Sequence, residues 1–366
     1  MYQYIRRSSE VICLYLKRSG SYLLYVTLNP DGQRPCNSSF DISPFRNIII
    51  PHLHRIPQFS LHSIYEFNPT LFNDPLFRSH LPQLRRLIIH WAPCYSLYAD
   101  NVAPGVFTGG TPLLTSVELQ GGGGTRLRPS FAAVTTLMLG SVNTSRQWNT
   151  IHFHDFLAAV PRLRSLRLDS DVIGSWNNPE PIAIPSLISL DMYTNPIFSP
   201  CIITALMTPN LESLTLRGVN ESVTIGLASV LKSQHRYPFL QSVHFYWLSI
   251  PDSYNRFATV LTMLPTVTHL SLVPGEVQEA LEILARNSSS ALILLPELSN
   301  LQFEPIDDGG DSIYNFISHR LTNGLRYQLS SFDAISQERH AWLRERLELE
   351  ELSSPNRWIY SSDLLF

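Results

Sequence analysis

Residues Pro161–Leu168 read Pro-Arg-Leu-Arg-Ser-Leu-Arg-Leu, and residues Pro209–Leu216 read Pro-Asn-Leu-Glu-Ser-Leu-Thr-Leu. This pattern, close to Pro-x-Leu-x-x-Leu-x-Leu, occurs nine times, and its first apolar residue recurs after 20 to 31 residues. A short strand that recurs at this spacing indicates a solenoid of stacked repeats. The copies are Pro82–Ile89, Pro112–Leu119, Ala132–Leu139, Pro161–Leu168, Pro185–Met192, Pro209–Leu216, Pro238–Phe245, Pro265–Leu272 and Pro296–Phe303.

The second half of each copy alternates apolar and other residues, which predicts a short β-strand. The proline stands just before the strand, where its missing N–H is tolerated. Between copies, apolar residues recur with helical spacing, as in Phe257, Val260 and Leu261 before Pro265. We therefore expect an α/β solenoid, a right-handed β–α coil with a parallel sheet on the concave side and helices outside.

Weaker signals extend this pattern toward both ends of the chain. Ile56, Phe59 and Leu61 repeat the apolar spacing 28 residues before Leu84, which indicates a degenerate tenth copy. Residues 1–50 are expected to form an N-terminal cap or first repeat, residues 51–310 the solenoid, and residues 311–366 a helical C-terminal cap. Outside the copies we expect helices at Ser9–Lys17, Ser312–Leu321 and Glu338–Leu352, a strand at Leu23–Leu28, and loops at residues 29–45 and Gly121–Gly124.

The composition excludes several classes of protein. Of 366 residues, 44% are apolar and 16% are charged, which allows a large core. A net charge of −3 without blocks of like charge argues against a nucleic-acid-binding protein. The four cysteines are far apart, which favours a reducing compartment. No apolar run reaches the roughly 18 residues of a membrane span. We expect a monomer in the cytoplasm or nucleus, without nucleic-acid or membrane partners.

Several residue groups have spacings that chemistry sometimes uses. His152 and His154 open an expected helix, where side chains two residues apart diverge by about 200°, and the pair His52 and His54 is interpreted in the same way. Gly121–Gly124 lacks the following Lys and Ser or Thr of a phosphate-binding loop. Asp169 and Asp171 are interpreted as turn residues rather than cation ligands. We predict no catalytic, cofactor-binding or metal site, although a triad assembled in space from Ser, His and Asp remains an alternative.

The residues between the leucines are the candidates for binding, because they point away from the core on the concave sheet face. Arg and Tyr are enriched at interface hot spots, so we expect Arg167, Tyr193, Arg217 and Tyr246 to anchor a partner protein. The alternative is that these positions form only a solvated sheet face. The full set of candidate partner-binding residues is Arg167, Asp169, Asp191, Tyr193, Arg217, His244 and Tyr246.

The copies resemble the leucine-rich repeat over roughly residues 56–304. The Asn or Cys that this family places three residues after the last strand leucine occurs only as Asn195. The resemblance therefore implies loose turns and irregular curvature. The segment Val-Ile-Cys-Leu-Tyr-Leu-Lys-Arg-Ser-Gly at Val11–Gly20, followed by the apolar Leu23–Leu28, is similar to the stretch that follows the F-box in F-box proteins of mushroom-forming fungi.

The second resemblance implies a substrate receptor that selects proteins for ubiquitination by an SCF-type ligase and does no chemistry itself. The F-box, a helical segment, is not present in these residues. A Skp-type adaptor is therefore expected as a partner only if an F-box exists upstream of Met1. The alternative function is an orphan leucine-rich-repeat scaffold protein without a ligase connection. The identity of the target protein is not encoded in any motif of the sequence.

Overall fold

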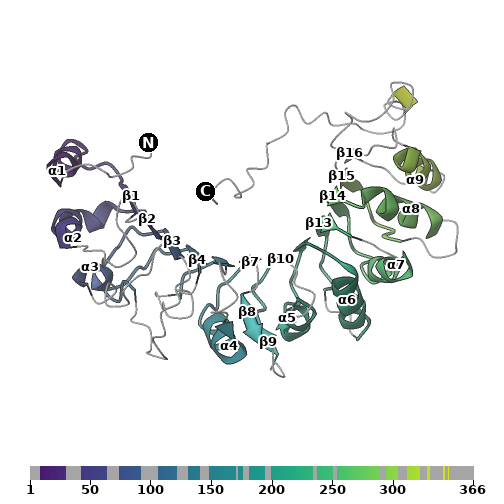
Figure 1. Ribbon diagram of the computed structural model, residues 1–366, viewed down its shortest axis with the longest axis horizontal. Coiled ribbons are helices and arrows are strands. Elements are labelled where there is room, and N and C mark those ends of the chain that lie inside the picture. Colours follow the sequence, from purple (N-terminus) through teal and green to yellow (C-terminus); the bar gives the residue numbers. More distant parts are fainter. Residues whose placement is uncertain are drawn as a thin grey trace. The chain divides into compact units, whose positions relative to one another are not determined.

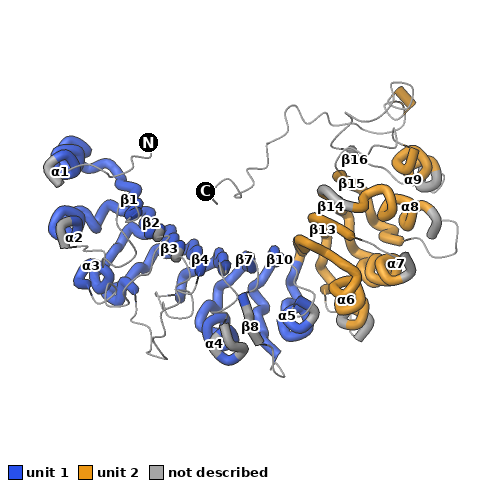
Figure 2. The backbone as a smooth tube through the Cα atoms, in the orientation of Figure 1, with its two compact units in different colours: residues 1–211 blue, residues 212–366 orange. Residues whose placement is uncertain are grey.

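The computed structural model describes residues 9–29, 43–63, 74–91, 106–121, 131–140, 148–169, 172–175, 181–193, 199–233, 237–249, 254–287, 294–303, 311–321, 328–329, 341–342 and 345. Two compact units divide the chain, unit 1 at residues 1–211 and unit 2 at residues 212–366 (Figure 2). The boundary between the units lies inside residues 51–310, which the sequence pattern predicts to be one array of repeats. Each unit is described by itself below.

Unit 1 is built on a parallel sheet whose strands follow one another in sequence order. Each strand pairs in register with its neighbour, so that Leu137, Leu166 and Leu190 lie side by side. The side chains of this row are 0 to 1% exposed and form the core against the helices. The strands are β1 (Tyr25–Leu28), β2 (Gln58–Ser63), β3 (Arg86–Trp91), β4 (Ser116–Gln120), β5 (Thr136–Gly140), β7 (Ser165–Asp169) and β10 (Ser189–Tyr193).

The helices of unit 1 lie on one face of this sheet (Figure 1). Short pairs of strands, β6 (Trp148–Asn149) with β8 (Ile173–Ser175) and β9 (Ile182–Ala183) with β11 (Leu206–Met207), complete the connections. The helices are α1 (Ser9–Arg18), α2 (Ser43–Ile49), the 3₁₀ helix η2 (Ile50–Arg55), α3 (Pro75–Arg78), α4 (Thr150–Ala158) and α5 (Ser199–Ala205).

A buried arginine ties the first helix of unit 1 to the repeat that follows it. The guanidinium of Arg55, a residue only 4% exposed, donates to the carbonyl oxygens of Leu16 at 3.0 Å and Tyr22 at 3.1 Å. It also donates to the hydroxyl of Ser19 at 2.9 Å. Carbonyl oxygens at a helix end lack partners within the helix, so a cation that pairs with them fixes the end of α1.

Unit 2 repeats the same arrangement with longer helices. Leu214, Val243, Leu270 and Leu301 form the central buried row of its parallel sheet. Asn220 caps the first helix, since its side-chain oxygen accepts from the backbone N–H of Val223 at 3.1 Å. The strands are β12 (Ser213–Arg217), β13 (Ser242–Leu248), β14 (His269–Gly275), β15 (Asn300–Phe303) and β16 (Gln328–Leu329), and the helices are α6 (Glu221–Ser233), α7 (Tyr254–Thr262), α8 (Val277–Asn287) and α9 (Asp311–Leu321).

The predicted strands are confirmed in both units, and the degenerate copy at Ile56–Leu61 contains β2. The predicted helix at Ser9–Lys17 is α1, and that at Ser312–Leu321 is α9. Two boundaries were wrong: the first strand begins at Tyr25 rather than Leu23, and the loop expected to end at residue 45 gives way to α2 at Ser43. The residue before a proline is restricted in a helix, but a proline in the first turn is tolerated, and Pro44 occupies that turn.

Three expectations lie largely outside the described residues. Only Gly121 of the glycine run is described, and Asp171 is not. Within Glu338–Leu352 the structure describes residues 341, 342 and 345, and the ring of Trp342 lies 4.6 Å from that of Tyr314 in α9. None of the described helices combines the length and the apolar character that a membrane crossing requires.

Candidate functional site

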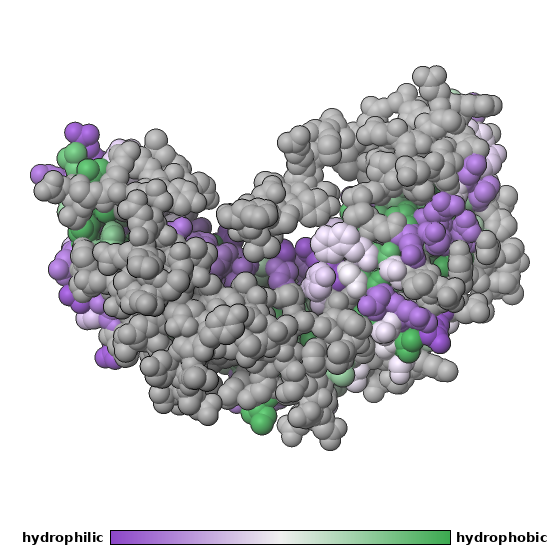
Figure 3. Space-filling model, viewed as in Figure 1, coloured by the Kyte–Doolittle hydropathy of each residue, from purple (hydrophilic) through white to green (hydrophobic). Residues whose placement is uncertain are grey.

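Each unit has a polar face, formed by the strand side chains that alternate with the buried rows and point away from the helices. Figure 3 shows hydrophilic residues along the strands between β4 and β10 of unit 1. The polar face of unit 1 carries Gln58, Ser60, His62, Arg86, Ile88, His90, Ser116, Glu118, Gln120, Thr136, Met138, Gly140, Ser165, Arg167, Asp169, Ser189, Asp191 and Tyr193, and that of unit 2 carries Ser213, Thr215, Arg217, Ser242, His244, Tyr246, His269, Ser271, Val273, Asn300 and Gln302.

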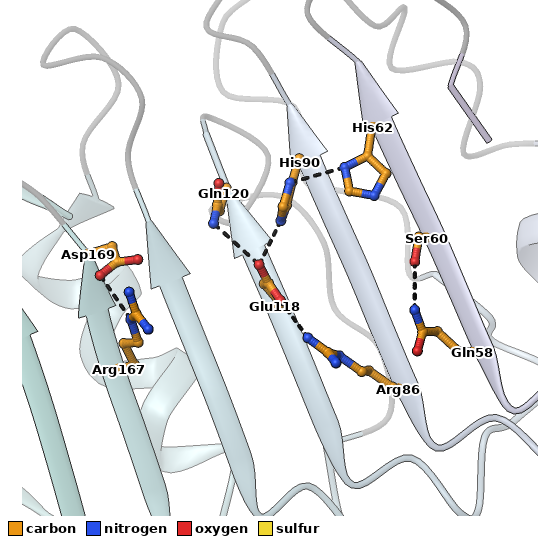
Figure 4. A network of polar contacts seen from close by, with 9 residues as sticks. All are labelled: Gln58, Ser60, His62, Arg86, His90, Glu118, Gln120, Arg167 and Asp169. Carbon is orange, nitrogen blue, oxygen red and sulfur yellow. Dashed lines mark hydrogen bonds and ion pairs between the residues drawn. The ribbon is translucent and has the colours of Figure 1, made fainter. Parts of the chain in front are cut away.

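Glu118 is the centre of a network on β2, β3 and β4 (Figure 4). It pairs in register with Ile88, so its carboxylate lies between Arg86 and His90, one polar-face position to either side on β3. Its Oε1 accepts from Nε2 of His90 at 2.7 Å, and its Oε2 accepts from the Arg86 guanidinium at 3.2 Å. Gln120 donates to the same Oε1 at 3.3 Å. The Glu118 carboxylate therefore accepts hydrogen bonds from three side chains on two strands.

The network continues to β2 through a pair of histidines. His62 pairs in register with His90, and their Nδ1 atoms lie 3.1 Å apart. The two rings meet edge to face, with centroids 4.5 Å apart and planes at 87°. The resulting chain, Glu118 to His90 to His62, crosses three consecutive strands of the sheet.

Burial and neighbouring charges fix the ionisation of both ends of this chain. Desolvation, with the nearby His90, lowers the pKa of His62 to about 4, against a smaller opposing effect of Glu118. Desolvation alone would raise the pKa of Glu118, but hydrogen bonds and charge from His90 and Arg86 outweigh it and lower that pKa. At neutral pH the carboxylate is therefore ionised, and His62 is neutral.

A second cluster of charges surrounds Arg167 on β7. Its Nε donates to Asp169 two residues along the same strand at 3.0 Å, and it lies 3.8 Å from an Asp191 carboxylate oxygen on β10. Desolvation would lower the pKa of Arg167, but these carboxylates reverse the effect and raise it. Gly140 lies beside this cluster, and a Cβ built there would stand 3.2 Å from Cγ of Gln120. Gly140 thus allows close packing between the two clusters.

The polar face of unit 2 carries fewer charged side chains than that of unit 1. Arg217 pairs in register with Tyr246, and its guanidinium carbon lies 5.3 Å from the centre of the ring. This distance is that of a cation–π contact. His244 lies in the next register position, beside Ser271, which is 2% exposed. Among the described residues, the hydroxyl of Ser271 has no hydrogen-bond partner.

The structure brings together two groups of the predicted residues, one within each unit. Arg167, Asp169 and Asp191 form one ion-pair cluster, and Arg217 contacts Tyr246. Tyr193 lies at the end of β10 and is 44% exposed. The sequence candidates omitted Arg86, His90, Glu118 and His62, although these occupy the same kind of strand position. The signal was available in the aligned copies, because residues at equal positions of successive copies become neighbours in a parallel sheet.

The histidine pairs that resemble metal ligands in the sequence have other surroundings. His154 lies in α4, as predicted, and its Nδ1 is 3.6 Å from a carboxylate oxygen of Asp155. His52 lies in η2, 3.1 Å from the guanidinium of Arg55. Burial and the charges of Arg55 and His54 lower the pKa of His52. Among the described residues no group of three His, Cys, Asp or Glu side chains has the geometry to hold a metal ion.

A separate apolar surface lies at the N-terminal end of unit 1, around α1 (Figure 3). Its exposed side chains come from α1, from the turn after it, and from the edge strand β1. Exposed apolar groups that gather in this way are common at interaction sites. The residues are Leu14, Tyr15, Tyr22, Leu23 and Tyr25, which are 45 to 79% exposed.

No protein-family model matches the chain, and no curated protein matches it. Among solved structures, the chain is similar to a protein from Bacteroides fragilis whose crystal structure was determined by a structural genomics consortium. The two are 12% identical, with a TM-score of 0.39, and the similarity covers 88% of this chain and 74% of that one. At these values the similarity supports no inference about fold or function.

Proposed function

We propose that this chain is a non-enzymatic recognition module of the leucine-rich-repeat type, whose polar faces bind a partner protein. One observation carries the proposal. In both units the strands keep one set of side chains buried as core, while the alternate set aligns charged and aromatic groups on the opposite face. Repeat proteins use extended sheet surfaces of this kind to bind other macromolecules.

The more specific function rests on the resemblance of the sequence to fungal F-box proteins. In that reading the chain is the substrate-receptor part of an SCF-type ubiquitin ligase. It would act in the cytoplasm or nucleus and would select a target for ubiquitination. A Skp-type adaptor joins the complex if the gene encodes an F-box upstream of Met1. Without that adaptor, the same polar faces would serve a scaffold protein.

Affinity purification of the full-length gene product from its source cells, followed by mass spectrometry, tests the specific function. Recovery of a Skp-type adaptor together with a further protein supports the substrate receptor. Recovery of a reproducible protein partner without the adaptor supports the scaffold. If no protein is enriched above a control purification, the recognition proposal is refuted.

Point variants then locate the binding surface for the recovered partner. Truncating an interface anchor typically costs about 2 kcal/mol or more. We therefore expect Arg167→Ala or Tyr246→Ala to weaken binding of the recovered partner about thirtyfold or more. Arg162→Ala is the matched control, because Arg162 is exposed and precedes β7, off the polar face. Unchanged recovery after combined substitution of Arg167, Tyr193, Arg217 and Tyr246 would exclude the polar faces.

A further inference from the structure

Glu118, His90 and His62 form a series of two hydrogen bonds. Before this series binds an additional proton, only one assignment of donors and acceptors is consistent. An ionised carboxylate only accepts, so Nε2 of His90 carries the proton of the 2.7 Å bond to Glu118. A neutral imidazole has one N–H, so Nδ1 of His90 must accept. Nδ1 of His62 then donates across the 3.1 Å contact. This leaves Nε2 of His62, at the other side of the ring, as a hydrogen-bond acceptor (Figure 4).

Uptake of one proton reverses the role of that outer nitrogen. A proton that arrives at Nε2 of His62 makes both of its nitrogens N–H groups. The Nδ1 proton of His62 then transfers to Nδ1 of His90, since burial disfavours a charge on His62 and the Glu118 carboxylate lies 2.7 Å from Nε2 of His90. The positive charge resides on His90, and neutral His62 now donates from Nε2. One proton has been bound in total, and the hydrogen bond between the two rings has reversed its direction.

Proton uptake also makes the net charge of the neighbouring side chains more positive. On β3 and β4 the charged neighbours are Arg86 and Glu118, and Arg167 of β7 acts on Glu118 from further along the sheet. On β1 the nearest titratable residue of the described part is Tyr25, which pairs in register with Gln58 rather than with His62. Arg86 and Glu118 cancel while His90 is neutral. Protonated His90 gives the three side chains a net charge of +1.

We propose that Glu118, His90 and His62 form a proton-controlled contact site for a carboxylate of the partner protein. The site binds the carboxylate when the two histidines hold the additional proton. The donor at Nε2 of His62 and the net positive charge both favour a carboxylate. In the deprotonated state the same position presents a lone pair and no net charge, so an acidic group is not bound. The proposal rests on the proposed recognition function and adds the chemical class of the bound group and its regulation.

Imidazole ¹⁵N NMR of the full chain, labelled on histidine and titrated from pH 8 to pH 5, tests the switch without any partner. At pH 8 we expect His62 to carry its proton on Nδ1, the less common tautomer, with Nε2 unprotonated. At lower pH Nε2 of His62 becomes protonated and Nδ1 loses its proton, while His90 acquires two N–H groups. The proposal is overturned if His62 keeps the Nε2–H tautomer throughout, or if His62 itself becomes doubly protonated.

Variants separate the switch from general effects on the fold. Glu118→Gln removes the negative charge 2.7 Å from Nε2 of His90, so the change in the His62 tautomer should need a lower pH than in the wild type. Asp169→Asn is the matched control, because Asp169 lies on the same face and its carboxylate accepts from Arg167. An equal shift in both variants would contradict the proposed chain. Thermal unfolding confirms that each variant is folded.

A peptide probe tests the class of bound group. Tetraglutamate is titrated into the full chain at the two ends of the pH range, with tetraglutamine as the neutral control. We expect tetraglutamate to perturb the His62 signals at least fivefold more at pH 5.5 than at pH 8, and His62→Gln to abolish the pH-dependent part of binding. Equal perturbation at both values, or by both peptides, overturns the carboxylate site. This outcome leaves the recognition function intact, since that function is tested by the anchor variants above.

Discussion

Replacing Glu118 with alanine tests the network on which the site depends. The strongest lost interaction is the bond to His90 at 2.7 Å, between side chains 14% and 23% exposed. The weaker ones are the pair with Arg86, which is 50% exposed, and the 3.3 Å bond from Gln120. A partly buried bond to a charged group contributes about 1.5 to 3 kcal/mol, and an exposed ion pair contributes less than about 1 kcal/mol. We therefore expect Glu118→Ala to lower the free energy of unfolding by about 2 to 3 kcal/mol.

For a unit of this size, that loss corresponds to a decrease in Tm of about 5 to 10 °C. Thermal unfolding followed by circular dichroism at pH 7.5 measures it. Asp155→Ala is the control, because the Asp155 side chain is 57% exposed, and its effect should stay below about 0.5 kcal/mol. If the two variants lose the same stability, Glu118 does not stabilise the network. The contact site inferred from Glu118, His90 and His62 is then refuted.

The pH dependence of this effect has a defined sign. The pKa of Glu118 in the folded protein lies below its ordinary value of 4.5. A carboxyl group with a lowered pKa stabilises the fold fully above the unfolded-state pKa and loses that contribution as the pH falls through the folded-state pKa. The difference in Tm between wild type and Glu118→Ala should therefore shrink below about pH 4.5. A difference that grows as the pH falls further below about 4.5 would contradict the assignment of the ionised carboxylate.

Three further predictions concern the sheet of unit 1. Leu166→Ala should cost about 2 to 5 kcal/mol, because Leu166 is fully buried, whereas its neighbour Arg167→Ala should cost less than about 1 kcal/mol; urea unfolding measures both, and equal losses would contradict the alternation. Gly140→Leu should lower stability by about 1 to 3 kcal/mol, because even a Cβ would stand 3.2 Å from Cγ of Gln120; an unchanged Tm would count against this packing. The pKa of His62 falls from 6.5 to about 4 on folding. The unfolded state therefore binds more protons between these values, and the free energy of unfolding decreases as the pH falls through this range. His62→Gln should reduce this dependence on pH in urea unfolding, and an unaltered dependence would refute the assignment.

The strands of the fold were predictable because each repeats the same local chemistry. Alternation such as Leu166, Arg167 and Leu168 specifies which side chains enter the core, and the structure follows it. The helix boundaries were harder, since they depend on contacts between repeats. Arg55 illustrates this, because its bonds to the end of α1 join residues 33 to 39 positions apart. No local pattern marks such a residue.

The candidate site was predictable as a surface but not as a network. Arg167 and Asp169 share one strand, so their i, i+2 spacing already places them on one face. Glu118 and His90 are 28 residues apart, and their contact depends on the register between strands. The spacing between copies varies from 20 to 31 residues, so the register followed only from aligning the leucines of the copies. Lowered pKa values likewise depend on burial that a sequence does not reveal.

The in-register, sequential order of the strands also constrains how this protein can change over evolution. His62, His90 and Glu118 belong to three successive repeats and meet only because no other strand separates them. Loss or duplication of one repeat would leave a well-packed core, since each row of leucines would meet an equivalent row. The same event would separate the histidines from their carboxylate. The core of such a protein therefore tolerates a changed number of repeats, whereas the proposed contact site depends on their order.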